Sequence, residues 1–271
     1  MQKVVLEKKT FQKFAKLVYE KCGIYLGEKK QALVQARVGK RMRALGIEGY
    51  LDYYHFVEQD SSGKELVSLL DAISTNVTHF FREDRHFKVL GLLLRQWEAA
   101  GQTRFRIWSA ASSSGEEPYS IAMTVLENLQ NPRDTKILAS DISTRLLEKA
   151  RQGIYEQRSM ETVPLKYQAR YFEALRGNDP VSYQVVPAVR DMVTFGRINL
   201  AKSPFPLKGP LDVVFCRNVM IYFDDTVRTT LLSNIHQLLK PKGYLMVGHA
   251  ESLSGGSYNF KRVEPSVYIK P

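Results

Sequence analysis

The chain contains little cysteine and no long apolar run. Its 271 residues include two cysteines, Cys22 and Cys216, which excludes a disulfide framework and a cysteine-rich zinc site. No apolar stretch reaches the roughly 18–20 residues that span a bilayer. The first residues lack the apolar core of a secretory signal, and there are no internal repeats or low-complexity tracts. We therefore expect a soluble, cytoplasmic protein with reduced thiols.

Acidic residues are in deficit. Lys and Arg total 39 against 28 Asp and Glu, which gives a formal net charge of +11. Such a surplus admits nucleic acid, anionic lipid and acidic protein surfaces as partners, and it does not choose among them. The length exceeds that of a typical single domain, so one larger and one smaller domain are expected.

The first part of the chain predicts helices and no strands. Apolar residues such as Phe11, Phe14 and Val18 recur at three- and four-residue steps, which is typical of an amphipathic helix. A basic helix is expected over about 28–45, with Gly46 at its end, and two more helices over 50–57 and 64–73. These segments predict an all-α N-terminal domain over residues 1–72.

In residues 73–271 short strands alternate with helices. Strands are expected over 105–110, 136–141, 193–198, 211–216 and 244–248, with one or two more over 260–269. Helices are expected over 116–129 and 226–239, and another through residue 150. This alternation predicts an α/β fold with a mostly parallel sheet and crossovers on both faces. A segment over about 167–192 breaks the alternation and predicts a small antiparallel β insertion.

The ends of the expected strands carry the polar residues, and ligands of open parallel sheets bind there. Small residues follow the first strand and lead to Gly115, Glu116 and Glu117. One glycine is too few for a dinucleotide fingerprint, and no Lys-Ser or Lys-Thr follows it as in a P-loop. Two carboxylates suit a ligand with cationic or hydroxyl groups. A plain strand-to-helix turn is the alternative.

Asp141 ends the second strand, where a carboxylate can accept hydrogen bonds from a ribose diol. The alternative is an ordinary helix cap. Asn199 and Asn218 follow two further strands at the same edge of the sheet. Together with the small-residue loop, Asp141 favours a cofactor that contains a nucleoside.

Five segments together resemble the chemotaxis receptor methyltransferases, the CheR family. They are 74–83 (STNVTHFFRE), 108–120 (WSAASSSGEEPYS), 139–142 (ASDI), 215–223 (FCRNVMIYF) and 248–252 (GHAES). The resemblance covers about residues 10–270 in the family's order. It implies a Rossmann-like class I methyltransferase domain over 73–271 that uses S-adenosylmethionine and releases S-adenosylhomocysteine.

The resemblance also implies site residues. Cofactor contacts are expected from Asn76, Thr78, Arg82, Glu117, Asp141, Asn199, Leu200, Asn218 and Val219, with Glu116 as the alternative to Glu117. Asp141 takes the ribose hydroxyls, and Arg82 and Tyr222 lie near the transferable methyl group as catalytic residues. Arg82 steers the substrate carboxylate or binds the cofactor's own carboxylate; packing is the alternative role of Tyr222.

The reaction that the resemblance implies is O-methylation of glutamate side chains on the cytoplasmic helices of chemoreceptors. The side chain of glutamate ordinarily has a pKa of about 4.3, so it needs no general base at neutral pH. Catalysis therefore rests on alignment and on exclusion of water. The alternatives are a methyltransferase for another protein or a nucleic acid, and a regulatory scaffold that only binds the cofactor.

The expected basic helix carries the candidate substrate contacts, which are Lys30, Arg37, Lys40, Arg41 and Arg43. A solvated charged face is the alternative, and no nucleic-acid motif supports RNA or DNA binding. Residues 176–180 hold a single glycine where family members that bind a receptor tether have a glycine-rich turn, so tether binding is doubtful. We expect no metal, because His79, His86 and His249 have no metal-ligand spacing with cysteine or acidic partners, and we expect a monomer.

Overall fold

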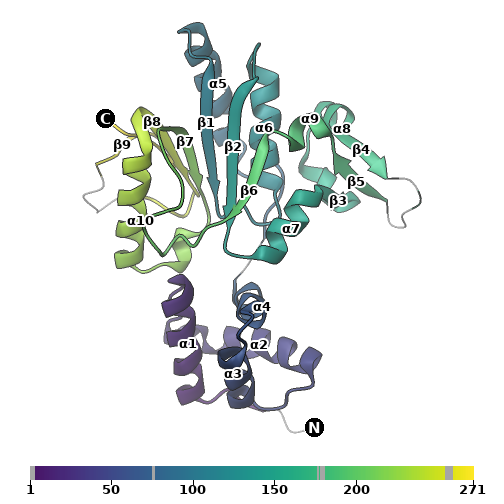
Figure 1. Cartoon of the computed structure of the whole chain (residues 1–271), viewed down its shortest axis with the longest axis vertical. Helices are drawn as coiled ribbons and strands as arrows, with labels where there is room; N and C mark the ends of the chain where they lie inside the picture. The colour runs from purple at the N-terminus through teal and green to yellow at the C-terminus, as the bar shows by residue number, and fades with distance from the viewer. Residues whose placement is uncertain (1–3, 75–76, 176, 178–180, 254–258) are drawn as a thin grey trace.

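A computed structural model describes residues 4–74, 77–175, 177, 181–253 and 259–271 (Figure 1). A small helical part lies at one end of the molecule, and an α/β part with a small side sheet forms the rest. Within the described residues, no helix is both long and apolar enough to cross a membrane.

The helical part consists of α1 (Lys8–Cys22), the short 3-10 turn η1 (Glu28–Lys30), α2 (Gln31–Leu45), α3 (Tyr50–Gln59) and α4 (Lys64–Ile73). The basic segment expected as one helix thus begins with a 3-10 turn. Phe14, Val18 and Val34 are fully buried between these helices, as their helical spacing predicts. Gly23 ends α1 with φ of 72°, a left-handed conformation that glycine adopts without strain.

The large sheet has the strand order β6-β2-β1-β7-β8-β10-β9. Its strands are β1 (Arg104–Ala110), β2 (Asp134–Asp141), β6 (Val193–Arg197), β7 (Leu211–Cys216), β8 (Leu239–Val247), β9 (Lys261–Glu264) and β10 (Val267–Ile269). The pairs from β6 to β8 are parallel, and β10 and β9 continue the sheet antiparallel. The predicted α/β fold is confirmed. Because the strand order reverses beside β1, the carboxyl ends of β1, β2 and β7 open a crevice.

Helices cover both faces of this sheet. They are α5 (Arg85–Ala99), α6 (Glu116–Asn128), α7 (Thr144–Gln152) and α10 (Asp225–Leu238), and the short 3-10 turn η3 (Met220–Tyr222) follows β7. Helix α5 was not predicted from the sequence. It buries Phe87, Leu90 and Leu94 in a cluster that also contains residues of α6 and β1.

The side sheet is larger than the predicted insertion over 167–192. It pairs β3 (Ile154–Glu156), β5 (Ser182–Val185) and β4 (Phe172–Leu175) antiparallel, in the order β3-β5-β4. The 3-10 turn η2 (Gln157–Thr162) and helices α8 (Leu165–Tyr171) and α9 (Pro187–Arg190) complete it. Strand β3 was missed because three residues are too few to show a period of two. Of the turn at 176–180, only Gly177 lies within the described residues.

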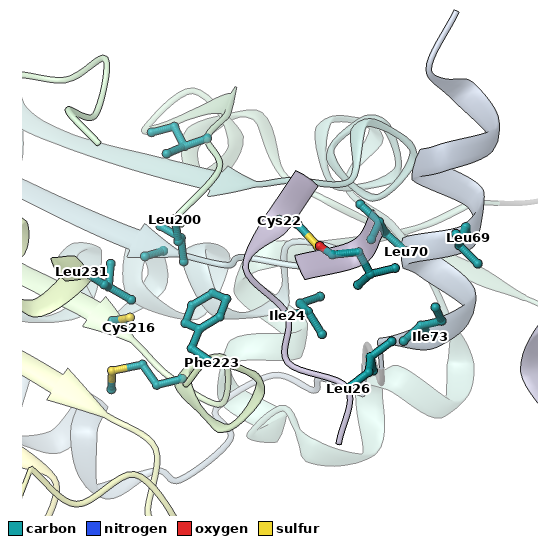
Figure 2. Close-up of a cluster of buried hydrophobic side chains, with 14 of the residues drawn as sticks. Cys22, Ile24, Leu26, Leu69, Leu70, Ile73, Leu200, Cys216, Phe223 and Leu231 are labelled. Atoms are coloured by element: carbon teal, nitrogen blue, oxygen red, sulfur yellow. The ribbon is translucent and has the colours of Figure 1, made fainter. Parts of the chain in front are cut away.

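The helical part is joined to the sheet by a continuous apolar core. Figure 2 shows Cys22, Ile24 and Leu26 beside residues of α4 and near Phe223 of the α/β part. Ile24 and Phe223 form an isolated antiparallel bridge, and the Tyr25 N–H donates to the Tyr222 carbonyl at 2.8 Å. Arg145 of α7 pairs with the mostly buried Asp71 of α4 at 2.7 Å. These contacts hold the helical part over the crevice.

Candidate active site

A cavity of about 480 Å³ lies at the carboxyl ends of β1, β2 and β7. The end of α1 and the end of α4 close it from the side of the helical part. Its volume is in the range of small-molecule sites. The cavity is lined by these candidate residues from the sequence: Thr78, Arg82, Glu117, Asp141, Asn199, Leu200, Asn218, Val219 and Tyr222. Asn76 lies outside the described residues.

Asp141 is held at the end of β2 by two backbone donors. Its Oδ2 accepts from the Ser113 N–H and its Oδ1 from the Ser143 N–H, each at 2.9 Å. Burial raises the pKa of this carboxyl. The cap of α7 is Ser143, whose hydroxyl accepts from the Leu146 N–H at 3.2 Å. Asp141 is therefore not the cap, and each of its oxygens keeps a lone pair for a ligand hydroxyl.

Glu116 and Glu117, which follow the loop after β1, have different surroundings. Glu117 lines the cavity, whereas Glu116 does not. Both Glu116 oxygens accept from the Ser114 hydroxyl, at 2.9 and 2.7 Å. Glu117 accepts from the Ser109 hydroxyl at 2.7 Å. Burial raises the pKa of both carboxyls. The geometry thus favours Glu117 over Glu116 as the residue that faces a ligand.

Arg217 is a central residue of the site to which the sequence analysis assigned no role. Its guanidinium is almost fully buried and lies 3.1 Å from Glu117 Oε2 and 3.0 Å from Glu83 Oε2. It also donates to the Arg82 carbonyl. Arg217 therefore balances two carboxylates and supports the segment that carries Arg82. The sequence signals were its place in the segment 215–223, which carries the family resemblance, and its position directly after the apolar strand β7.

Glu251 shapes the loop after β7 and was also missed. Its carboxylate accepts from the backbone N–H groups of Asn218 at 2.6 Å, Met220 at 2.7 Å and Gly248 at 2.7 Å. Asn218 has φ of 58°, a left-handed conformation that asparagine tolerates better than most residues. A Cβ on Gly248 would lie 2.5 Å from the Asn218 Nδ2 and 2.7 Å from the Glu251 Oε2, so a side chain there would displace both groups. This network fixes the position of Asn218 at the cavity.

Arg82 and Tyr222, the expected catalytic residues, line the same cavity from different segments. Arg82 precedes α5 and donates to the Val77 carbonyl at 2.8 Å. Lys30 Nζ lies 5.8 Å from the centre of the Tyr222 ring, within the range of a cation–π contact. Asn199 also lines the cavity, but its amide donates to the Lys21 carbonyl at 2.7 Å and accepts from the Ala201 N–H at 3.0 Å.

The basic residues of α2 have unequal surroundings. Arg37 donates to the Ile73 and Ser74 carbonyls at 2.8 and 2.9 Å, at the end of α4. Arg41 forms a two-point ion pair with the buried Glu65 at 2.9 and 2.6 Å. Lys40 and Arg43 are exposed. Arg37 and Arg41 thus stabilise the helical part, and substrate binding by the five basic residues Lys30, Arg37, Lys40, Arg41 and Arg43 stays a prediction.

Replacing Arg41 with alanine will lower the free energy of unfolding by about 1–3 kcal/mol, because Glu65 loses its two-point partner in a buried position. The matched control is Arg43→Ala on the same helix. This substitution will change the free energy of unfolding by less than about 0.5 kcal/mol. Urea unfolding measures both. Equal effects of the two substitutions would contradict the structural role of Arg41.

The cavity fits S-adenosylmethionine. The buried Asp141 carboxylate suits the ribose diol, and the small residues Ala111, Ser112 and Ser113 let a ligand approach the backbone. Asp141 and Glu117 are carboxyl groups in the cavity wall and suit a ligand that carries a sulfonium and an ammonium group.

Known proteins resemble the chain over nearly its whole length. Residues 9–74 match the family described as CheR methyltransferase, all-alpha domain, and residues 76–269 match CheR methyltransferase, SAM binding domain. The chemotaxis protein methyltransferase of Borreliella burgdorferi is 37% identical over 98% of this chain and 95% of its own length. That of Salmonella typhimurium is 38% identical over 98% and 92%.

Chemotaxis protein methyltransferase 2 of Pseudomonas aeruginosa is 40% identical over 95% of this chain and 91% of its own length. The resemblance expected from the motifs is thereby confirmed, and so is the helical domain followed by a cofactor-binding α/β domain. On these matches, together with the cavity at the strand ends, the chain belongs to the CheR family of methyltransferases, which use S-adenosylmethionine.

Proposed function

We propose that this enzyme transfers a methyl group from S-adenosylmethionine to glutamate side chains of chemoreceptor cytoplasmic helices, giving glutamyl methyl esters. One observation carries the proposal. The catalytic candidates Arg82 and Tyr222 line the cavity with Asp141, and Lys30 of the basic segment lies over the Tyr222 ring. Lys30 therefore places a positive charge beside the cavity, where an acidic helix can present a carboxylate.

The residues of this chain act by binding and alignment. When bound, S-adenosylmethionine would supply a methyl group on a sulfonium, and S-adenosylhomocysteine would leave as the methyl–sulfur bond breaks. An ionised substrate carboxylate can accept this methyl group without a general base. Arg82 orients that carboxylate, and Tyr222 covers the reacting centre. The apolar junction of Ile24 with Phe223 excludes water from the helical side. We assign cofactor contacts to Asn76, Thr78, Glu117, Asp141, Asn199, Leu200, Asn218 and Val219.

The proposal extends to partners and place of action. A substrate on the cytoplasmic part of a receptor requires an enzyme in the cytoplasm. The single glycine at 176–180 supports action without a receptor tether. We also propose that the enzyme acts as a monomer.

The experiment uses S-adenosylmethionine with a labelled methyl group and a receptor cytoplasmic fragment, followed by mild base. Methyl esters release volatile methanol, whereas methylated nitrogen does not. We expect volatile label that disappears when the receptor glutamates are replaced by alanine. Arg82→Ala will reduce the rate roughly 10²-fold, the scale of losing one group that positions or stabilises the reacting centre. The control is Arg133→Ala. Arg133 is exposed and does not line the cavity, so this substitution will leave the rate unchanged.

Two outcomes would contradict the proposal. Base-stable label would indicate a methyltransferase for a different acceptor. Cofactor binding without transfer to any receptor fragment, together with unchanged function of Arg82→Ala in cells, would indicate a regulatory scaffold.

A further inference from the structure

Two histidines and a glutamate meet beside the cofactor cavity. Glu83 precedes α5, His86 lies in its first turn, and His249 follows β8. One potential ligand atom from each lies within 4.8 Å of the others. Glu83 Oε2 is 3.6 Å from His86 Nδ1 and 3.8 Å from His249 Nε2. Spacing along the chain gives no sign of this cluster, because residue 249 reaches Glu83 and His86 only through the fold.

His86 is fully buried, and neither of its ring nitrogens has a hydrogen-bond partner within the described part of the chain. Glu83 Oε2 likewise lacks a hydrogen bond there, although it is paired with Arg217. A buried polar group without a partner costs about 1–3 kcal/mol. A neutral imidazole offers one lone pair and one N–H. The unpartnered nitrogens of His86 beside a carboxylate therefore point to a ligand that binds the lone pair of one of them.

The charges around the cluster admit a cation. The Arg217 guanidinium lies 3.0 Å from Glu83 Oε2 and would repel a cation bound there. Glu117 lies on the other side of the same guanidinium at 3.1 Å, and the Glu251 carboxyl accepts from the N–H of Gly248, next to His249. Two carboxyl groups therefore flank the Arg217 guanidinium, and a third lies next to the segment that carries His249, so the cluster can accept positive charge.

The cluster is also accessible. The His249 side chain is 58% exposed, and it lines a second cavity of about 250 Å³. The other residues that line this second cavity are Ser252, Arg262, Pro265, Ser266 and Tyr268. An ion can therefore reach the cluster from solvent without passing through the cofactor cavity.

We propose that Glu83, His86 and His249 bind one Zn²⁺ ion. Two imidazole nitrogens and one carboxylate oxygen are a ligand set that Zn²⁺ prefers, with a fourth position left open. Ligand atoms of a tetrahedral Zn²⁺ lie about 3.4 Å apart, given bond lengths near 2.0–2.1 Å. The two separations from Glu83 Oε2, 3.6 and 3.8 Å, need shifts of only a few tenths of an ångström. The two imidazole nitrogens lie within 4.8 Å of each other, and rotation of the exposed His249 side chain can close that separation.

The test measures Zn²⁺ affinity of the full chain without a polyhistidine tag, freed of metal by a chelator. Zn²⁺ is titrated in competition with a chromophoric chelator. We expect one saturable equivalent, weakened about tenfold or more in His249→Ala, since even residues behind the ligands change affinity by 10–100-fold. Because His249 is exposed, this variant keeps the fold, whereas a change at the buried His86 endangers it.

The matched control is His55→Ala. His55 also lies beside a carboxylate, 3.7 Å from Glu58, but no third ligand joins them among the residues that the structure describes. We expect it to bind Zn²⁺ like the unsubstituted chain. At one Zn²⁺ concentration, Zn²⁺ will raise the Tm of the unsubstituted chain and of His55→Ala by the same amount, and that of His249→Ala by less. Absence of saturable binding, or equal affinity in His249→Ala, would overturn the proposal.

Discussion

Replacing Asp141 with asparagine will weaken the binding of S-adenosylhomocysteine by about 10²-fold. The Asp141 oxygens each accept one backbone N–H, from Ser113 and Ser143. An asparagine side chain has only one oxygen, so its NH2 group must face one of these two backbone donors. The ribose also loses one of the two oxygens that could accept its hydroxyl groups. Hydrogen bonds to charged groups contribute about 1.5–3 kcal/mol each, and about 2.7 kcal/mol corresponds to 10²-fold. Isothermal titration calorimetry measures the change.

Asp134→Asn is the matched control for this prediction. Asp134 begins the same strand, β2, at the end opposite the cavity, and its exposed carboxylate pairs with Arg106. We expect its cofactor affinity to change by less than about twofold, because exposed ion pairs contribute little. Equal losses in both variants would mean that Asp141 acts through the stability of the strand and not through the ligand.

Replacing Arg217 with methionine will lower the free energy of unfolding by about 3–5 kcal/mol. The substitution leaves two buried carboxylates, Glu83 and Glu117, without their partner, and a buried charge without compensation costs this much. The Arg82 carbonyl also loses a donor. Chemical unfolding measures the effect. Adding Glu117→Gln to this variant should recover part of the loss, because one uncompensated charge is removed.

Arg85→Met tests whether burial decides the size of this effect. Arg85 also makes a two-point pair, with Glu264 at 2.9 and 2.9 Å, but its side chain is 56% exposed. We expect a loss of about 1 kcal/mol or less, as for other exposed pairs. A loss as large as that of Arg217→Met would contradict the assignment.

The sequence alone determined the local features of this protein. Its helical spacing predicted α1, α3 and α4, and its short apolar segments predicted the parallel strands. Placing polar residues at strand ends was enough to bring Asp141, Asn218 and Glu117 to one cavity, because parallel strands place their carboxyl ends at one edge. The longest motifs also identified the family, which the comparisons confirmed.

Only the tertiary structure decided what the charged residues do. Arg217 contacts Glu83 and Glu117, which lie in distant parts of the chain, and His249 joins Glu83 from another part again. Arg41, on a basic face that the sequence left open as solvated, pairs with Glu65. Spacing along a chain reports which residues share a helix face or a strand. The role of a charge depends on its burial and on its partners, which long-range packing brings together.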